Sequence, residues 1–166
     1  MGETGKAGLR LLIKIVLVTA IFWAVFTFVL GLHVNRGLRM VPYVMDGDLV
    51  VTYKLERYQA GDIVAYRSPQ SGKTELSRIA AIGAHVVSLS GNKELLIDGR
   101  APEGGAAFLT EPPEGESLTY PYTMGEDGVF LLDDSREGGK DSRIFGEITR
   151  KELLGKVVYL FRRRGF

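Results

Sequence analysis

The chain has 166 residues, 45% of them hydrophobic, which is enough for one compact domain with a real core plus an appendage. Its 21 lysines and arginines nearly balance 20 aspartates and glutamates, so no basic surface suggests a nucleic acid as partner. Because cysteine is absent, disulfides, thiolate zinc sites and cysteine nucleophiles are excluded.

The first predicted element is a transmembrane helix over residues 11–31. Ile15 to Gly31 are 17 residues without a charge, and Leu11 to Ile13 extend the run if Lys14 reaches back to the headgroups. About 20 such residues span a hydrocarbon core about 30 Å thick. The alternatives are a cleaved signal sequence and a buried core helix, but no A-x-A cleavage pattern follows the run. The lipid bilayer is therefore the first partner that we expect.

The orientation of this helix does not follow from its flanking charges. The cations are Lys6, Arg10 and Lys14 before the uncharged run, and His33, Arg36 and Arg39 after it. The positive-inside rule consequently gives little preference.

After the helix the pattern changes to short strands. Runs rich in Val, Ile, Leu and Tyr, separated by Gly, Pro, Asp and Asn, cover residues 48–54, 62–66, 75–82, 85–89, 95–97, 129–132 and 156–161. They predict a mainly β domain over residues 36–166. Within it, residues 100–127 hold four of the six prolines and are interpreted as a loop-rich insertion.

Four stretches of this domain resemble motifs of the type I signal peptidases, in the same order. They are GLRMVPYVMDGDLV at 37–50, GDIVAY at 61–66, LSRIAAIG at 76–83 and DDSREGGKDSRIFGEI at 133–148. The predicted helix matches the membrane anchor of that family. The resemblance implies a bent β-sheet or barrel, cleavage of signal peptides by a serine nucleophile, and a β domain on the extracytoplasmic side, with residues 1–10 as a short cytoplasmic tail.

The resemblance also places three substitutions in the catalytic site. Arg39 stands at the position of the nucleophilic serine and Ser77 at that of the general-base lysine, while Gly139 replaces a serine that hydrogen-bonds the lysine. In a Ser/Lys dyad, a desolvated lysine loses its proton and then accepts the proton of the serine hydroxyl. Arginine stays protonated and is a poor nucleophile. The sequence therefore predicts that proteolysis has been lost.

The other motif positions have structural roles by resemblance. Gly37 flanks the oxyanion pocket, Met40 forms the floor of the cleft, and Pro42 fixes the adjoining turn. Arg78 and Ser142 belong to the third and fourth motifs.

Two pairs of opposite charge are two residues apart in the fourth motif. They are Asp134 with Arg136 and Asp141 with Arg143, which would share one face of an extended segment. They are either surface salt bridges of small energy or buried pairs that brace the former site, and the resemblance favours the latter.

Arg39 itself needs a partner, because an unpaired buried guanidinium is costly. Ser77 and backbone carbonyl groups are the nearest candidates, with Asp134 or Asp141 as further ones. Replacement of the lysine by Ser77 removes a like-charge clash with Arg39, so the two substitutions are interpreted as compensatory.

The leading hypothesis is a membrane-anchored, catalytically inactive relative that binds an extended peptide, signal peptide or pilin subunit, with a sortase as a further candidate partner. One alternative is an active signal peptidase that uses Ser77 as nucleophile and Lys140 or another lysine as base. A second is an unrelated, membrane-tethered β-rich binding module. No cofactor or metal is expected, since His33 and His85 are the only histidines and neither belongs to a recognisable site.

Overall fold

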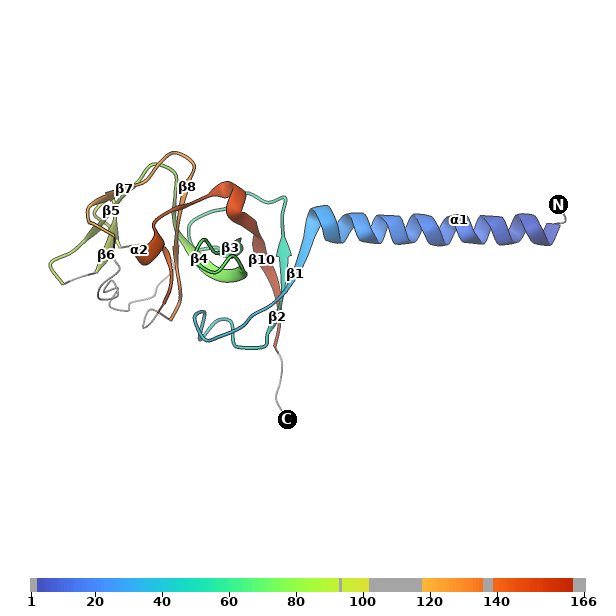
Figure 1. The fold of residues 1–166 in the computed structure, drawn as a ribbon, viewed down its shortest axis with the longest axis horizontal. Coiled ribbons are helices and arrows are strands. Elements are labelled where there is room, and N and C mark those ends of the chain that lie inside the picture. The colour runs from blue at the N-terminus through green and yellow to red at the C-terminus, as the bar shows by residue number, and fades with distance from the viewer. Residues whose placement is uncertain (1–2, 93, 102–117, 136–138, 163–166) are drawn as a thin grey trace.

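One long helix stands away from a β domain in the computed structural model, which describes residues 3–92, 94–101, 118–135 and 139–162 (Figure 1). Helix α1 (Glu3–Ala24) continues as a π-helical segment (Val25–Val29). In the part of the chain that the structure describes, Lys6–Val29 is the one helix long and apolar enough to cross a membrane, and its apolar window is not buried. This exposure matches the all-round apolar character of the segment.

The end of the helix differs from the predicted span. Residues 30 and 31 were expected within the membrane segment, but they open strand β1 (Leu30–Val34). The amide of Leu30 closes the last helical turn on the carbonyl of Val25, and the strand starts at the same residue. Hydropathy alone could not separate the two elements, because the apolar run continues across the boundary.

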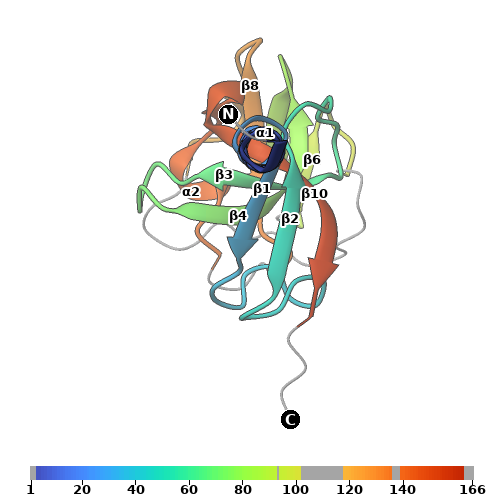
Figure 2. The same cartoon turned by 90° about the vertical axis from the view of Figure 1, so that its right-hand side faces the viewer.

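Within the described residues, ten strands form two antiparallel sheets, so the prediction of a mainly β domain behind one N-terminal helix is confirmed. The larger sheet has the order β1, β2 (Leu49–Tyr53), β10 (Leu153–Phe161), β3 (Ile63–Arg67), β4 (Thr74–Ile82), β8 (Gly128–Leu132) and β9 (Ile148–Thr149). The smaller sheet has the order β6 (Leu95–Ile97), β5 (Val86–Leu89) and β7 (Tyr122–Thr123). The larger sheet is curled, with β3 and β4 running across the direction of β1 and β2 (Figure 2).

All seven predicted strand runs contain a strand, but five other elements were not predicted. These are β1, β7, β9, the helix α2 (Ser142–Phe145) and the 3-10 turn Arg150–Glu152. Strand β7 lies in the predicted loop-rich insertion and pairs with β5, while residues 102–117 of that insertion lie outside the described residues. A two-residue strand is too short to show alternation of polar and apolar side chains, so its sequence gives no signal.

Strand β4 lies between β3 and β8 in the larger sheet. Thr74 to Ser77 pair with β3 alone, Arg78 pairs with both neighbours, and the residues from Ile79 to Ile82 that pair do so with β8. Among the described residues, strand β1 likewise pairs on one side only, with β2. Among the described residues, the outer side of β1 and the first half of β4 are therefore open strand edges of the larger sheet.

Candidate functional site

The loop between β1 and β2 carries Arg39. Met40, next to it, is fully buried and packs in a cluster with Val44 and Leu76, which anchors the loop on the sheet. The carbonyl of Arg39 accepts a 2.7 Å hydrogen bond from the amide of Ser135, just beyond β8. These two attachments hold the Arg39 side chain over the start of β4.

Gly37 and Pro42 lie on the exposed part of this loop. Gly37 adopts φ = 95°, a conformation that favours glycine, and its amide donates a 2.7 Å hydrogen bond to Oδ1 of Asp46. The amide thus already has an acceptor. The predicted roles of Gly37 in an oxyanion pocket and of Pro42 in the turn stay predictions, and the burial of Met40 agrees with a place in the floor.

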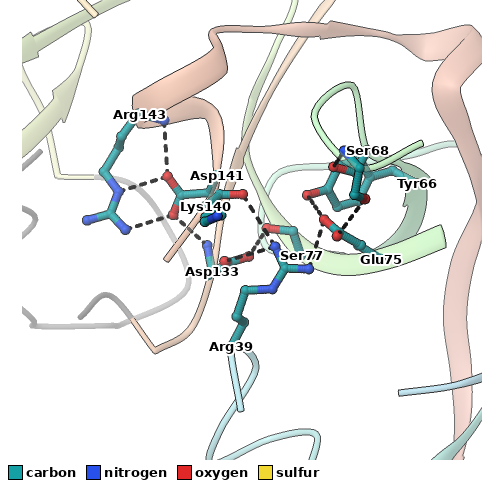
Figure 3. Close-up of polar contacts among 10 residues, drawn as sticks. Arg39, Tyr66, Ser68, Glu75, Ser77, Asp133, Lys140, Asp141 and Arg143 are labelled. Atoms are coloured by element: carbon teal, nitrogen blue, oxygen red, sulfur yellow. Dashed lines mark hydrogen bonds and ion pairs between the residues drawn. The ribbon is translucent and has the colours of Figure 1, made fainter. Parts of the chain in front are cut away.

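The guanidinium of Arg39 makes three contacts with neighbouring oxygen atoms (Figure 3). Its Nη2 lies 2.8 Å from Oε2 of Glu75, and its Nη1 lies 3.8 Å from Oδ2 of Asp133. Nη1 also donates a 3.4 Å hydrogen bond to the carbonyl of Lys140. The side chain is 25% exposed, so Arg39 is a partly buried cation with its charge balanced.

These partners correct the sequence-based expectation. A backbone carbonyl does accept from Arg39, but Asp134 and Asp141 are engaged with other arginines, and Ser77 is joined to Arg39 only through Asp133. Glu75 was missed. It lies two residues before Ser77 on β4 and therefore on the same face of the strand, which is the signal that could have found it.

Ser77 is fully buried, and its hydroxyl donates a 3.0 Å hydrogen bond to Oδ1 of Asp133. The contact follows from the register of the sheet, because Arg78 pairs with Leu132 and thus brings Ser77 beside Asp133. Ser77 and Arg39 therefore meet at the same carboxyl group. Asp133 is the second site residue that sequence reasoning did not single out.

Asp133 is a buried acid with an unusual titration. Burial, together with the nearby charge of Asp141, raises its pKa from 3.8 to about 7, although Arg39, the Ser77 hydroxyl and Arg143 act in the opposite direction. Among the described residues, no hydrogen-bond donor reaches its Oδ2. This carboxyl can exchange a proton near neutral pH.

Glu75 is the charged partner of Arg39. Its Oε1 accepts a 2.9 Å hydrogen bond from the hydroxyl of Ser71, and the Tyr66 hydroxyl donates to Oε2 at 3.3 Å. Burial works against ionisation, but the hydrogen bonds from Arg39 and Ser71 outweigh it and hold the pKa of Glu75 below its usual value. The ion pair is therefore charged at neutral pH.

Two further arginine–carboxylate pairs surround this cluster. Arg143 and Asp141 form the expected pair, with 2.8 and 2.9 Å contacts, and both side chains are buried. The two residues do not share one extended segment, however, because Asp141, extended itself, caps helix α2, in which Arg143 lies, and accepts from the amide of Arg143. Its other oxygen accepts from the amide of Asp133, so the pair braces the site directly.

Asp134 binds an arginine of strand β4. Both of its oxygens accept 2.8 Å hydrogen bonds from Arg78, whose guanidinium also contacts the carbonyl of Gly61 and lies over the ring of Tyr43. Arg136 lies outside the described residues. The pairing of β4 with β8 places Arg78 beside Asp134. This contact cannot be predicted from spacing along the chain.

Three remaining positions fill out the site. The hydroxyl of Ser142 accepts from the amide of Leu131, a structural role. A Cβ atom on Gly139 would lie 2.8 Å from Nη2 of Arg143 and 3.3 Å from Oδ2 of Asp133, so a side chain there would crowd the buried pair. Lys140 is exposed, and its contact with this cluster is made by its carbonyl group.

A cavity of about 370 Å³ opens beside Arg39. It is lined by residues 33–36, at the end of β1, by Arg39, and by residues 73–76, at the start of β4. The described residues include no group of three or more His, Cys, Asp or Glu side chains that could hold a metal ion. The charged side chains in the wall of the cavity are those of Arg36, Arg39, Lys73 and Glu75.

Comparison with known families agrees with the motifs. A profile described as signal peptidase, peptidase S26, matches residues 8–161. The chain belongs to this signal peptidase family. The suspected resemblance is thereby confirmed, and together with the N-terminal apolar helix it indicates a single-pass membrane protein.

Relatives within the signal peptidase family share about a quarter of the sequence. A probable signal peptidase I-1 of Synechocystis is 24% identical over 135 residues, which is 74% of this chain and 66% of the relative. Signal peptidase IB of Staphylococcus aureus strain COL is 25% identical over 174 residues, covering 94% of this chain and 90% of the relative. A crystal structure of a signal peptidase I from Enterococcus faecalis aligns with a TM-score of 0.46 at 22% identity, over 63% of this chain and all of the other.

Proposed function

We propose that this member of the signal peptidase family has lost proteolysis and uses its cleft to bind an extended peptide segment. The observation that carries the proposal is that Arg39 is a charged side chain held in an ion pair. Its guanidinium is held by Glu75 at 2.8 Å at the position where family resemblance expects the nucleophile. The pKa of Arg39 is raised, since Asp133 and Glu75 more than offset the effect of burial, so the side chain remains a cation.

The proposed loss of hydrolysis has a simple chemical basis. Acyl transfer by a hydroxyl needs a group that takes up its proton. Arg39 has no lone pair for that purpose, and a protonated guanidinium is a poor nucleophile. Ser77, at the base position, is a hydroxyl that already donates to Asp133. Neither substituted position supplies what a Ser/Lys mechanism requires.

Peptide binding makes no such demand. The open edges of β1 and β4 border the cavity beside Arg39, and main-chain pairing with an added strand needs neither a nucleophile nor a base. We therefore propose an accessory or scaffold role in protein export or pilus assembly, with the β domain outside the cytoplasmic membrane. The client in this proposal is a signal peptide or pilin subunit, and a sortase is the neighbour in the assembly.

The proposal is tested by two measurements on the purified full chain. A serine-directed acylating inhibitor should leave its mass unchanged, while an active signal peptidase treated in parallel is modified. A photoreactive residue in place of Thr74, which lines the cavity, should crosslink a signal peptide, whereas the same residue in place of the distant Arg57 should not. An adduct on Ser77 would refute inactivity, and no crosslink from Thr74 would refute binding.

One observation favours the second candidate, an active peptidase with a rearranged site. Ser77 donates to a buried carboxyl whose pKa of about 7 suits a general base. The base in this version is Asp133 rather than Lys140. Ser77 is fully buried, however, so a substrate would have to displace Arg39 first. Cleavage of a preprotein that survives Arg39→Ala and disappears in Ser77→Ala would establish this candidate.

A further inference from the structure

The cavity beside Arg39 combines open main chain with an excess of positive charge. Its lining includes the cations Arg36, Arg39 and Lys73 but only one carboxylate, that of Glu75. Arg39 already holds Glu75 at 2.8 Å. The charges of Arg36 and Lys73 are therefore left without compensation inside the lining.

Arg36 and Lys73 are both exposed, and neither makes an ion pair within the part of the chain that the structure describes. They come from different segments, one following β1 and the other preceding β4. His33 adds no positive charge at neutral pH, since burial and the nearby Lys54 lower its pKa. An anionic group entering the cavity would meet two cations with little loss of existing contacts.

The open strand edges around the cavity indicate which class of ligand would bear the anionic group. Strand β1 pairs only with β2, and Thr74 to Leu76 pair only with β3, among the described residues. An extended peptide can bind such edges through its own amides and carbonyls, whereas a lipid headgroup or free phosphate offers no equivalent donors and acceptors.

We propose that the cavity recognises an extended peptide through a carboxylate, placed between Arg36 and Lys73, with an acidic side chain or a chain terminus as its source. This inference rests on the proposed peptide-binding function and defines the class of its client. Charge complementarity supplies selectivity, while the strand edges supply the sequence-independent part of the affinity.

The test uses the full chain in neutral detergent and eight-residue β-forming peptides with blocked ends and an uncharged fluorophore. One peptide has a central Glu, a second has Gln there, and a third is the Gln peptide with a free carboxyl end. Fluorescence anisotropy should show the Glu or the free-carboxyl peptide binding about tenfold more tightly than the blocked Gln peptide. Which of the two gains identifies the source of the carboxylate. Molar salt should reduce the difference.

The decisive variant is Arg36→Gln/Lys73→Gln, which should remove the preference while keeping the affinity for the blocked Gln peptide. Arg57→Gln/Lys151→Gln removes the same charge from exposed positions outside the cavity and should keep the preference. Equal affinity for all three peptides would overturn the inference and leave peptide docking intact. Displacement of the Glu peptide by inorganic phosphate, with no binding of the blocked Gln peptide, would show a plain anion site and overturn both proposals.

Discussion

The buried hydroxyl of Ser77 donates a hydrogen bond to Oδ1 of Asp133, which is itself inaccessible to solvent. The opposite oxygen of that carboxyl faces Nη1 of Arg39 at 3.8 Å. One acid therefore joins the two positions that family resemblance assigns to the dyad. Its protonation links them and makes the site sensitive to pH.

Asp133 should make the folded chain less stable as pH rises from about 4 to about 7. Its pKa is raised from 3.8 to about 7, so in this interval the folded state keeps a proton that the unfolded state has released. Between about pH 5 and pH 8 the loss should be about 2 to 3 kcal/mol. Urea unfolding followed by circular dichroism at both pH values measures it.

The variant Asp133→Asn is the control for that slope, because the amide cannot ionise. It should lose less stability than the unchanged chain between the two pH values. The ion pair of Glu75 has the opposite sign and acts at lower pH, since its lowered pKa weakens the fold only as pH falls below about 4.5. Parallel curves for both proteins would contradict the assignment to Asp133.

Arg39→Ala should destabilise the chain by about 1 to 3 kcal/mol, because Glu75 and Asp133 lose their shared cation. It should also raise the pKa of Asp133 further, since Arg39 lowers it now. Chemical denaturation gives the first quantity and NMR titration of the carboxyl gives the second. Arg57→Ala, which removes an exposed arginine, should change neither. An unaltered Asp133 titration in Arg39→Ala would disprove the coupling.

Arg39→Ser alone should not produce cleavage of a preprotein, because no base accompanies the new hydroxyl. Ser77→Lys alone should destabilise the fold, since it places a second cation in the buried space near Arg39. The double change Arg39→Ser/Ser77→Lys has the chemical groups of a dyad and should give measurable cleavage of a signal peptide. Cleavage by the unchanged chain at a comparable rate would show that the dyad is not needed.

Gly139→Ala should cost about 1 to 3 kcal/mol, because the added Cβ would lie 2.8 Å from Nη2 of Arg143, which Asp141 holds in place. Gly91→Ala, with no atom within 4 Å of the new Cβ, is the matched control. Gly139→Ser should for the same reason lower the stability of the variant Arg39→Ser/Ser77→Lys. Equal unfolding midpoints for the two alanine variants would argue against crowding.

Arg143→Met should be among the most damaging substitutions, at about 3 to 5 kcal/mol, because it leaves Asp141 as a buried charge without its cation. Lys156→Met breaks the more exposed contact with Asp62 and should cost less than about 1 kcal/mol. Thermal melts of the two variants give the comparison. Similar losses of stability in the two variants would mean that burial does not determine the energy of the Arg143–Asp141 pair.

Protease added to intact protoplasts should remove the β domain and leave the anchor, which tests the proposed extracytoplasmic side. The flanking cations are similar before and after the helix, so the experiment rather than the charge pattern decides. A cytoplasmic protein probed in the same sample should stay intact. Full protection of the β domain would reverse the orientation.

Apolar runs in the sequence predicted the helix and most strands, and motifs predicted the positions of the site. Neither predicted the contacts between segments that lie far apart in the sequence. Residues 75–82 are rich enough in apolar side chains to predict β4, and the motif around Arg39 marked the substituted nucleophile. Glu75 was not singled out because its meeting with Arg39 joins the loop before β2 to β4, two segments that lie far apart in the sequence. Strand register brings Arg78 to Asp134 from 56 residues away, a contact that spacing along the chain does not predict.

The direct passage from helix to strand at Leu30 limits how far the cleft can lie from the membrane anchor. No linker separates the two elements, and the ammonium of Lys54, just after β2, donates a 2.8 Å hydrogen bond to the carbonyl of Thr27, which attaches the helix end to the sheet. The five residues of β1 rise about 3.3 Å each, so Val34 lies within about 16 Å of the end of the helix. Because β1 runs largely across the direction of α1 (Figure 2), the cavity at the end of β1 stays close to the anchor, and a client held in the same bilayer would meet it with a stretch of chain near the membrane.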